Sequence, residues 1–133
     1  MSLRISLKDL IPIYMPWLCV EYGFAVVEDQ YSPESFGDSL VILESSTLRL
    51  QIIRDRGQLF TQVASKRIPE MWFNLEDLCA LIAGHPISMP LDVKLLSNVL
   101  RIYLSSIVER LSGDLQETHN QIQAGLLHRP TED

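Results

Sequence analysis

Residues 47–65 carry the pattern of a β-hairpin, and no other stretch constrains the fold as strongly. Two runs in which apolar and polar residues alternate, 47–54 and 59–65, are separated by a turn signal that contains Gly57. A period of two places alternate side chains on the same face of a strand. The sequence therefore predicts two antiparallel strands whose two faces differ in polarity.

The polarity pattern also predicts the register of this hairpin. It favours pairing Arg54 with Leu59, because a slip by one residue would mix Phe60 and Gln62 into the apolar face. The predicted apolar face, which should pack under helices, consists of Leu48, Leu50, Ile52, Leu59, Thr61 and Val63. The predicted opposite face consists of Arg49, Gln51, Ile53, Phe60, Gln62 and Ala64.

Two further runs complete the predicted sheet. Residues 24–29 and 39–44 are apolar segments bounded by turn-forming residues, which is typical of strands. Because the connections are short, consecutive strands should pair antiparallel. We expect a four-stranded antiparallel meander.

Helical patterns flank this sheet on both sides. Ser6 begins a capping-box-like sequence, which predicts a short turn and then a helix over about residues 13–22 that Gly23 ends. Beyond Pro69 the apolar period changes from two to about 3.6. This change predicts C-terminal helices over 75–83, 91–111 and 114–127. The fold class that follows is α+β: an N-terminal helix, the meander, and C-terminal helices packed on one face of the sheet.

Length and helix composition set the domain organisation. A chain of 133 residues fits one domain, expected over 1–127, with a frayed tail at 128–133. Apolar residues cover most of the circumference of the predicted helix 91–111. A helix of this kind is buried on more than one side, so it either fills the core or contributes to an oligomer interface.

Charge and apolar run lengths exclude two classes of partner. The formal net charge of −6 argues against binding to nucleic acid, where phosphate neutralisation dominates affinity. Pro12 and Pro16 interrupt the apolar segment near the N-terminus, and no run reaches the roughly 18 residues that span a bilayer. Cys19 and Cys79 are expected to be small buried side chains in a reducing compartment. We therefore expect a cytoplasmic protein that binds no membrane.

The sequence offers no catalytic or metal-binding constellation. A nucleophilic triad needs a histidine near a serine or cysteine and an acid, but His85, His119 and His128 lie in no such context. No cysteine and histidine have the spacing of metal ligands, and no glycine-rich loop forms a phosphate site. The sequence thus predicts a protein that is no enzyme and holds neither a metal nor another cofactor.

Two charged groups are candidate contact surfaces. Residues 28–38 contain four acidic side chains and are expected mainly as a solvated loop, although a cation or a basic partner would also suit them. A basic group lies on and after the hairpin, and charged edge strands commonly prevent unwanted pairing. This group consists of Arg49, Arg54, Arg56, Lys66 and Arg67.

The non-apolar face of the hairpin is the sharper hypothesis for a contact surface. It brings the aliphatic Ile53 beside the aromatic Phe60 with arginine nearby, which is the composition of an interface anchor. The candidate partner-binding residues are Arg49, Gln51, Ile53, Arg54, Phe60 and Gln62. The alternative is that the N-terminal helix or the tail covers Ile53 and Phe60.

A resemblance narrows the expected class of function. About two thirds of the chain resembles small bacterial α+β proteins that are similar to toxin-immunity proteins. The segments that carry it are Tyr22–Phe24, Val41–Ser45, Leu48–Gln58, Trp72–Phe73 and Leu75–Gly84. The resemblance carries over no catalytic residue. It implies a cytoplasmic protein-binding module that neutralises a cognate toxin by occlusion.

Two other classes of function stay open at this point. One is a small-ligand-binding or enzymatic α+β domain with a pocket between the sheet and helix 91–111. The other is an oligomeric structural protein built on the C-terminal helices, for which a homodimer is the simplest form.

Overall fold

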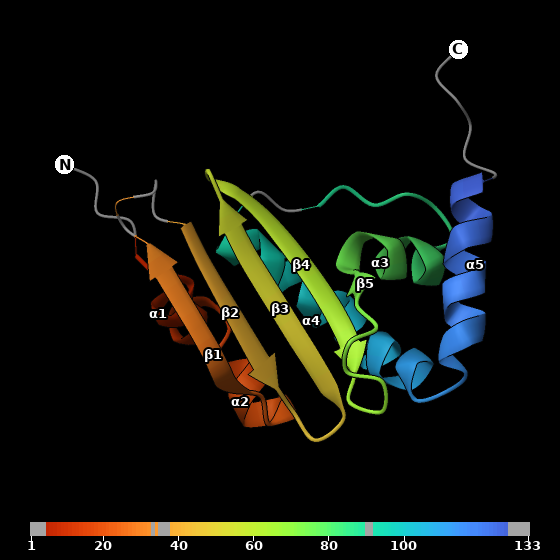
Figure 1. Cartoon of the computed structure of the whole chain (residues 1–133), viewed down its shortest axis with the longest axis horizontal. Coiled ribbons are helices and arrows are strands. Elements are labelled where there is room, and N and C mark those ends of the chain that lie inside the picture. The colour runs from red at the N-terminus through yellow and green to blue at the C-terminus, as the bar shows by residue number, and fades with distance from the viewer. Residues whose placement is uncertain (1–4, 33, 35–37, 90–91, 128–133) are drawn as a thin grey trace, which may run out of the picture.

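A five-stranded antiparallel sheet forms one layer of the molecule, and its order follows the sequence, β1-β2-β3-β4-β5 (Figure 1). The strands are β1 (Ala25–Ser32), β2 (Asp38–Glu44), β3 (Leu48–Asp55), β4 (Gln58–Ser65) and β5 (Phe73–Asn74). The computed structural model describes residues 5–32, 34, 38–89 and 92–127, so the tail predicted over 128–133 lies outside the described residues. The α+β class and the meander are confirmed, with β5 added to the four predicted strands.

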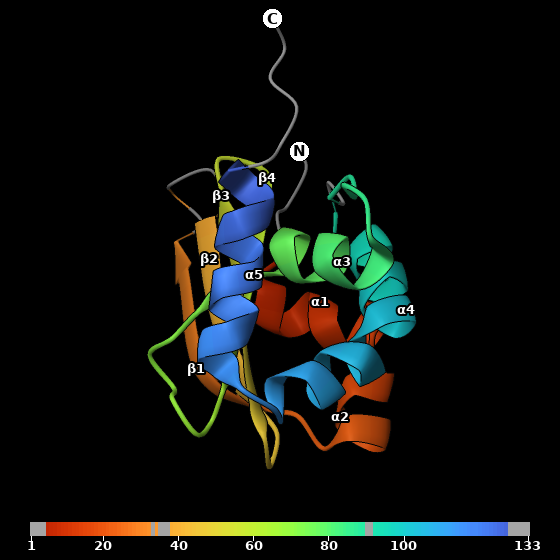
Figure 2. The ribbon, with the colours of Figure 1, turned by 90° about the vertical axis from the view of Figure 1, so that its right-hand side faces the viewer.

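Helices form the second layer and cover one face of the sheet (Figures 1 and 2). They are α1 (Leu7–Tyr14), α2 (Trp17–Tyr22), α3 (Leu75–Ala83), α4 (Val93–Leu111) and α5 (Leu115–Leu127). Helices α1, α2 and α4 lie behind the sheet in Figure 1, α3 lies beside β5, and α5 stands next to α3.

The N-terminal helix is divided in two, which corrects the predicted turn followed by a helix over about 13–22. Helix α1 begins directly after Ser6, whose side chain accepts a hydrogen bond from the backbone N–H of Asp9 at 3.4 Å. Met15 then leaves the helical region, with φ −143° and ψ 55°. A residue that precedes proline disfavours the helical conformation, and Pro16 has no N–H to continue the ladder. Gly23 ends α2 in the left-handed region, at φ 75°, as predicted.

The hairpin has the predicted register. Arg54 lies opposite Leu59, and one further pair, Asp55 with Gln58, closes the ladder. The connection is therefore two residues, Arg56 and Gly57, with φ of 53° and 82°. Two successive positive φ angles are the signature of a type I′ turn, whose twist matches that of the strands.

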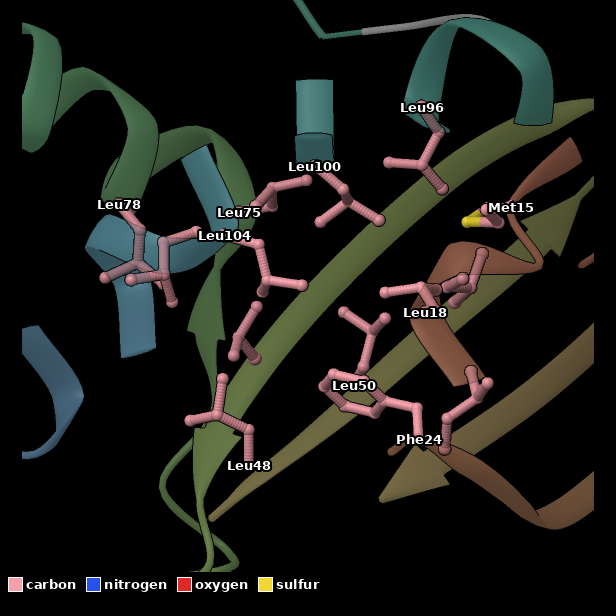
Figure 3. Close-up of a cluster of buried hydrophobic side chains, with 14 of the residues drawn as sticks. Met15, Leu18, Phe24, Leu48, Leu50, Leu75, Leu78, Leu96, Leu100 and Leu104 are labelled. Carbon is pink, nitrogen blue, oxygen red and sulfur yellow. The ribbon is translucent and has the colours of Figure 1, made fainter. Parts of the chain in front are cut away.

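The core lies between the sheet and the helices (Figure 3). The helix-facing side of β2, β3 and β4 contributes side chains that are at most 1 % exposed, namely Val41, Leu43, Leu48, Leu50, Ile52 and Val63. The helices contribute others that are equally buried, among them Leu18, Leu75, Leu96, Leu100 and Leu104. Leu59 and Thr61 share this side and are half-buried. The predicted apolar face of the hairpin is thus the helix-covered face.

Helix α4 buries one side only. Its buried stripe includes Leu96, Leu100 and Leu104, whereas Leu95 is 46 % exposed and Ile102 is 68 % exposed. The expectation that α4 fills the core is met, since it contacts β4, α1, α3 and α5, but the expected burial of its other apolar side chains is wrong for Leu95 and Ile102. The helix lies in the layer that covers the sheet, and nothing in the described part of the chain covers its outward side.

The two cysteines differ in their surroundings. Cys79 of α3 is fully buried, and burial raises the pKa of its thiol from 9.0 to about 12. Cys19 is exposed, which corrects its predicted burial. Helix α2 is short, and its buried positions are Trp17 and Leu18, so the following residue turns away from the core.

Candidate protein-contact surface on the open sheet face

The sheet face opposite the helices is named here the open sheet face, and it is turned toward the viewer in Figure 1. Antiparallel pairing aligns its side chains in rows that cross the strands, because directly opposed residues share a face. One row is apolar on β2, β3 and β4, one carries amides on β3, β4 and β5, and one contains an ion pair. These rows include five of the six residues predicted to bind a partner.

The apolar row crosses three neighbouring strands. Leu40 of β2 lies opposite Ile53 of β3, and Ile53 lies opposite Phe60 of β4. Phe60 is 48 % exposed, and the two aliphatic side chains are half-buried. The predicted pairing of Ile53 with Phe60 is present, and Leu40 extends it. Sequence reasoning missed Leu40, because its place depends on the β2–β3 register.

The second row is a ladder of side-chain amides. Gln51 donates from Nε2 to Oε1 of Gln62 at 2.9 Å, and Gln62 donates from Nε2 to Oδ1 of Asn74 at 3.2 Å. Asn74 occupies the N-cap position of α3 but makes no capping hydrogen bond with its side chain. Its amide instead continues the ladder onto β5, which provides a polar border beside the apolar row.

Arg49 braces one end of the open sheet face. Its Nε donates to Glu44 Oε2 at 3.0 Å, its Nη1 donates to the carbonyl of Pro69 at 2.8 Å, and its guanidinium carbon lies 4.9 Å from the centre of the Trp72 ring. Lys66 adds a second ion pair to Glu44 at 3.5 Å. The loop after β4 is thereby held near this end, and the positive charge of Arg49 is matched within the chain.

Arg54 does not belong to the open sheet face. It lies opposite Ser39 and Leu59, and it shares the face of Leu50 and Ile52, which is the face that the helices cover. Its Nη2 donates to the carbonyl of Ile5 at 2.6 Å. The placement of Arg54 on the predicted contact surface is therefore corrected, since strand alternation puts it on the face opposite to Ile53.

The alternative in which the N-terminal helix covers Ile53 and Phe60 does not fit the structure. Helices α1 and α2 both lie on the opposite face of the sheet (Figure 2). The tail, the other segment considered for this role, lies outside the described residues.

The other predicted candidates do not combine into a site among the described residues. His85 is exposed, His119 lies on α5, and His128 falls outside the described residues. No group of three or more His, Cys, Asp or Glu side chains within the described ranges could hold a metal ion. The acidic segment is not mainly a loop as expected, because Glu28 and Asp29 lie on β1 and Asp38 begins β2. Glu28 accepts a hydrogen bond from Gln30 at 2.8 Å.

A cleft of about 380 Å³ lies where a small-ligand pocket was considered, between the sheet and the C-terminal end of α4. Its polar groups are engaged locally. Arg67 Nη2 donates to the carbonyls of Leu111 and Gly113 at 2.8 and 2.5 Å, and the Ser65 hydroxyl accepts from the Arg67 backbone N–H at 3.1 Å. Since these groups point to partners within the chain, they leave few donors or acceptors for a ligand.

Comparison with protein-family models, with curated proteins and with solved structures yields no match to this chain. Within the described ranges, none of the helices has both the length and the apolar character needed to cross a membrane. The geometry of the open sheet face therefore remains the basis for any functional assignment.

Proposed function

We propose that this chain is a non-catalytic, cytoplasmic protein-binding module whose contact surface is the open sheet face. The observation that carries the proposal is the apolar row formed by Leu40, Ile53 and Phe60, which no described helix covers. An aligned aromatic and aliphatic row on a sheet is suited to fill a partner's hollow, because strand pairing fixes where its side chains start.

The surroundings of the apolar row support the same use. The amide ladder of Gln51, Gln62 and Asn74 lies next to it and can form the polar rim that interfaces carry around an apolar centre. Arg49 contributes indirectly, since its contacts hold the border of the face in place. Phe60 is the expected anchor, as aromatic side chains are enriched among the residues that dominate binding energy.

A toxin-immunity role is the specific form of this proposal. It rests on the resemblance of the hairpin and α3 segments to toxin-immunity proteins. Such a protein acts by covering the active cleft of its toxin, which requires an exposed complementary surface and no catalytic group of its own. The exposed Phe60 on the open sheet face supports this form of the proposal.

Site-specific photo-crosslinking tests the contact surface. A photoreactive phenylalanine analogue placed at position 60 of the full chain, in the cells that naturally produce it, should form a covalent adduct with one discrete partner. The same analogue at position 20 on α2, where the native Val20 is 84 % exposed, serves as the matched control. Phe60→Ser should abolish co-purification of that partner while the folded signal of the domain is retained.

The outcome also separates the toxin role from a general binding role. If the adduct partner is a toxin encoded beside this gene, co-expression should protect cells from it, and Phe60→Ser should remove that protection. Equal adducts from positions 60 and 20, or none from position 60, would place the contact surface elsewhere.

Self-association through α4 is a second candidate function. Leu95 and Ile102 are separated by seven positions, lie on one side of the helix and are both exposed. A second copy could cover these side chains in a symmetric contact. Sedimentation analysis should then show a dimer that Ile102→Glu dissociates, whereas a monomer at all concentrations would remove this candidate.

A further inference from the structure

Strand β4 is paired along its whole length on one side only, where β3 lies. On its other side β5 pairs with Gln62 and Val63, and the chain then enters α3 at Leu75. Figure 1 shows β5 beside the C-terminal part of β4, while the part near the hairpin turn has no neighbour among the described strands. Residues 59–61 are therefore an edge of the sheet, named here the β4 edge.

The direction of the backbone groups at the β4 edge follows from one hydrogen bond at the other end of the hairpin. The N–H of Lys66 donates to the carbonyl of Thr47 at 2.9 Å, in line with the β3–β4 register. Successive residues of a strand direct their backbone groups to opposite sides, so Phe60 bonds to β3, whereas Leu59 and Thr61 direct theirs away from it. The N–H of Thr61 and both backbone groups of Leu59 thus lie on the unpaired side. Among the described residues, no backbone bond outside the strand ladders reaches either residue.

A cleft of about 380 Å³ lies directly beside the β4 edge. Its walls are the three edge residues, Asn74 and Glu76 at the start of α3, and Met89 from the connection between α3 and α4. Phe60 borders the cleft from the open sheet face, and the half-buried Leu59 and Thr61 border it from the helix-covered side. The outward backbone groups therefore meet a hollow where a neighbouring strand would lie.

The opposite edge of the sheet is protected against strand pairing, and the β4 edge is not. Strand β1 has a bulge between Val26 and Glu28, and it carries two adjacent exposed carboxylates, Glu28 and Asp29. Bulges and charges are devices by which edge strands avoid pairing with other chains. Residues 59–61 pair regularly with β3 and carry no charge, and their phenylalanine and threonine favour strands. The β4 edge thus keeps the properties that allow a strand to be added.

We propose that the β4 edge binds a short extended segment of a partner protein, which adds a strand to the sheet and ends or turns away beside Asn74. The backbone of the segment bonds to Leu59 and to the N–H of Thr61. Of three successive apolar side chains in the segment, the middle one covers Phe60 and continues the apolar row, and the outer two enter the cleft toward Met89. This inference rests on the proposed function and names the binding mode and the chemistry of the partner segment.

The position of β5 selects such a segment over a second copy of this chain. Two β4 edges that paired about Phe60 would bring a residue of the second copy opposite Gln62, whichever way the second strand ran. Asn74 already occupies the place opposite Gln62. A separate segment that stops or turns at this point avoids the collision.

Three peptides with the same side chains test the inference. The first is acetyl-Lys-Val-Ile-Val-Lys-amide, the second carries N-methyl groups on both valines, and the third carries one on the isoleucine. Because their charge and side chains are identical, they differ only in which backbone N–H groups they offer. Each peptide is titrated into the isotope-labelled full chain and followed by amide chemical shifts.

The expected result depends on the alternation of the strand. The unmethylated peptide should shift the amides of Leu59 and Thr61, which gain an acceptor, more than that of Phe60, which already bonds to β3. Methylation of one alternate set of nitrogens should weaken binding about tenfold, and methylation of the other set should change it by less than about twofold.

Proline substitutions on the two edges of the sheet separate the lost hydrogen bond from general strain. Thr61→Pro removes an N–H that points away from β3, so the ladder with β3 is kept while the bond to the segment is lost. Asp29→Pro is the matched control on β1. Asp29 lies opposite Val41, and the bond from the N–H of Ser45 to the carbonyl of Leu48 shows that residues of β2 in this alternation face β3, so Asp29 directs its N–H away from the sheet. Thr61→Pro should weaken the unmethylated peptide about tenfold, and Asp29→Pro should leave its affinity unchanged.

Three results would overturn the inference. They are the absence of shifts at about millimolar unmethylated peptide, equal effects of the two methylation patterns, and an unchanged affinity in Thr61→Pro. If Thr61→Pro does not fold, the methylated peptides decide the question alone, since they leave the protein unaltered. A dimer of the full chain that Thr61→Pro dissociates would identify a second copy as the occupant and would also refute the proposal.

The photo-crosslinked partner distinguishes this inference from the proposed function. If the adduct at position 60 persists in Thr61→Pro, the partner covers the open sheet face without adding a strand, and only the strand addition is refuted. If position 60 gives no adduct in the parent chain, the open sheet face itself loses its proposed role. Loss of the adduct in Thr61→Pro, with retention in Asp29→Pro, is the result expected when both proposals hold.

Discussion

Replacement of Leu100 by alanine is the most direct test of how α4 stabilises the fold. Leu100 lies near the middle of α4, is 0 % exposed, and belongs to the cluster that fills the space between the sheet and the helices (Figure 3). Leu100→Ala removes about three methylene equivalents at about 0.8 kcal/mol each, or about 2.4 kcal/mol. A residual void of about 50 Å³ adds about 1.2 kcal/mol, at about 24 cal/mol per Å³.

The expected loss in the free energy of unfolding is therefore about 3.6 kcal/mol, a large share of the about 5–15 kcal/mol typical of a domain. With a urea dependence of about 2 kcal/mol per molar, the unfolding midpoint should fall by about 1.8 M. Ile102→Ala is the control on the same helix, where the side chain is 68 % exposed, and it should cost less than about 0.5 kcal/mol. A loss below about 1 kcal/mol for Leu100→Ala, or equal losses at the two positions, would refute the assignment of the buried side of α4.

Four further outcomes follow from particular side chains. A thiol reagent should label exposed Cys19 rapidly and Cys79 only after unfolding. Because the native pKa of Cys79 is raised from 9.0 to about 12, its thiol contributes stability that is present below pH 9 and lost as the pH rises toward 12. Urea titrations of Cys79→Ala should therefore show a shallower decline over that range than the parent protein. Arg56→Asn should raise the unfolding free energy by about 0.5–1 kcal/mol, since asparagine tolerates the positive φ of 53° better than arginine does. A loss of stability in this variant would contradict the turn assignment. Arg49→Ala should destabilise the domain by about 1–3 kcal/mol and change the fluorescence of Trp72, and Arg49→Lys should have an intermediate effect. A loss of stability no larger than that caused by replacing an exposed arginine such as Arg56 would count against the bracing role of Arg49.

The hairpin register was predictable because a strand alternates with a period of exactly two residues. A slip of the β3–β4 pairing by one residue would have placed Gln62 on the buried face or Val63 on the open one. The same rule, applied one residue further, places Arg54 opposite Leu59 on the helix-covered face. Arg54 was assigned to the contact surface because of its charge. Its position in the alternating pattern of the strand places it on the other face, which explains the error.

Helix boundaries and cysteine burial were less predictable, since they depend on how much of each helix finds a neighbour. Apolar residues surround α4 in sequence, but a two-layer arrangement supplies neighbours on one side only, so Ile102 stays exposed. Cys19 lies in an apolar stretch, but the break at Met15 sets a new helix whose buried positions end at Leu18. Whether an apolar residue of a helix is buried is therefore decided by its neighbours and not by its own polarity.

The sequence by itself determined the fold class, the meander and the two-faced hairpin, because these follow from local periodicity and turn chemistry at Gly57. Only the tertiary structure decided what the open sheet face presents. The β2–β3 register brings Leu40 into line with Ile53 and Phe60, and the fold of the loop after β4 turns Arg49 from a candidate contact into a brace against Glu44 and Trp72. Pairings between separate segments depend on loop paths and on the packing of the whole chain, which no local pattern encodes.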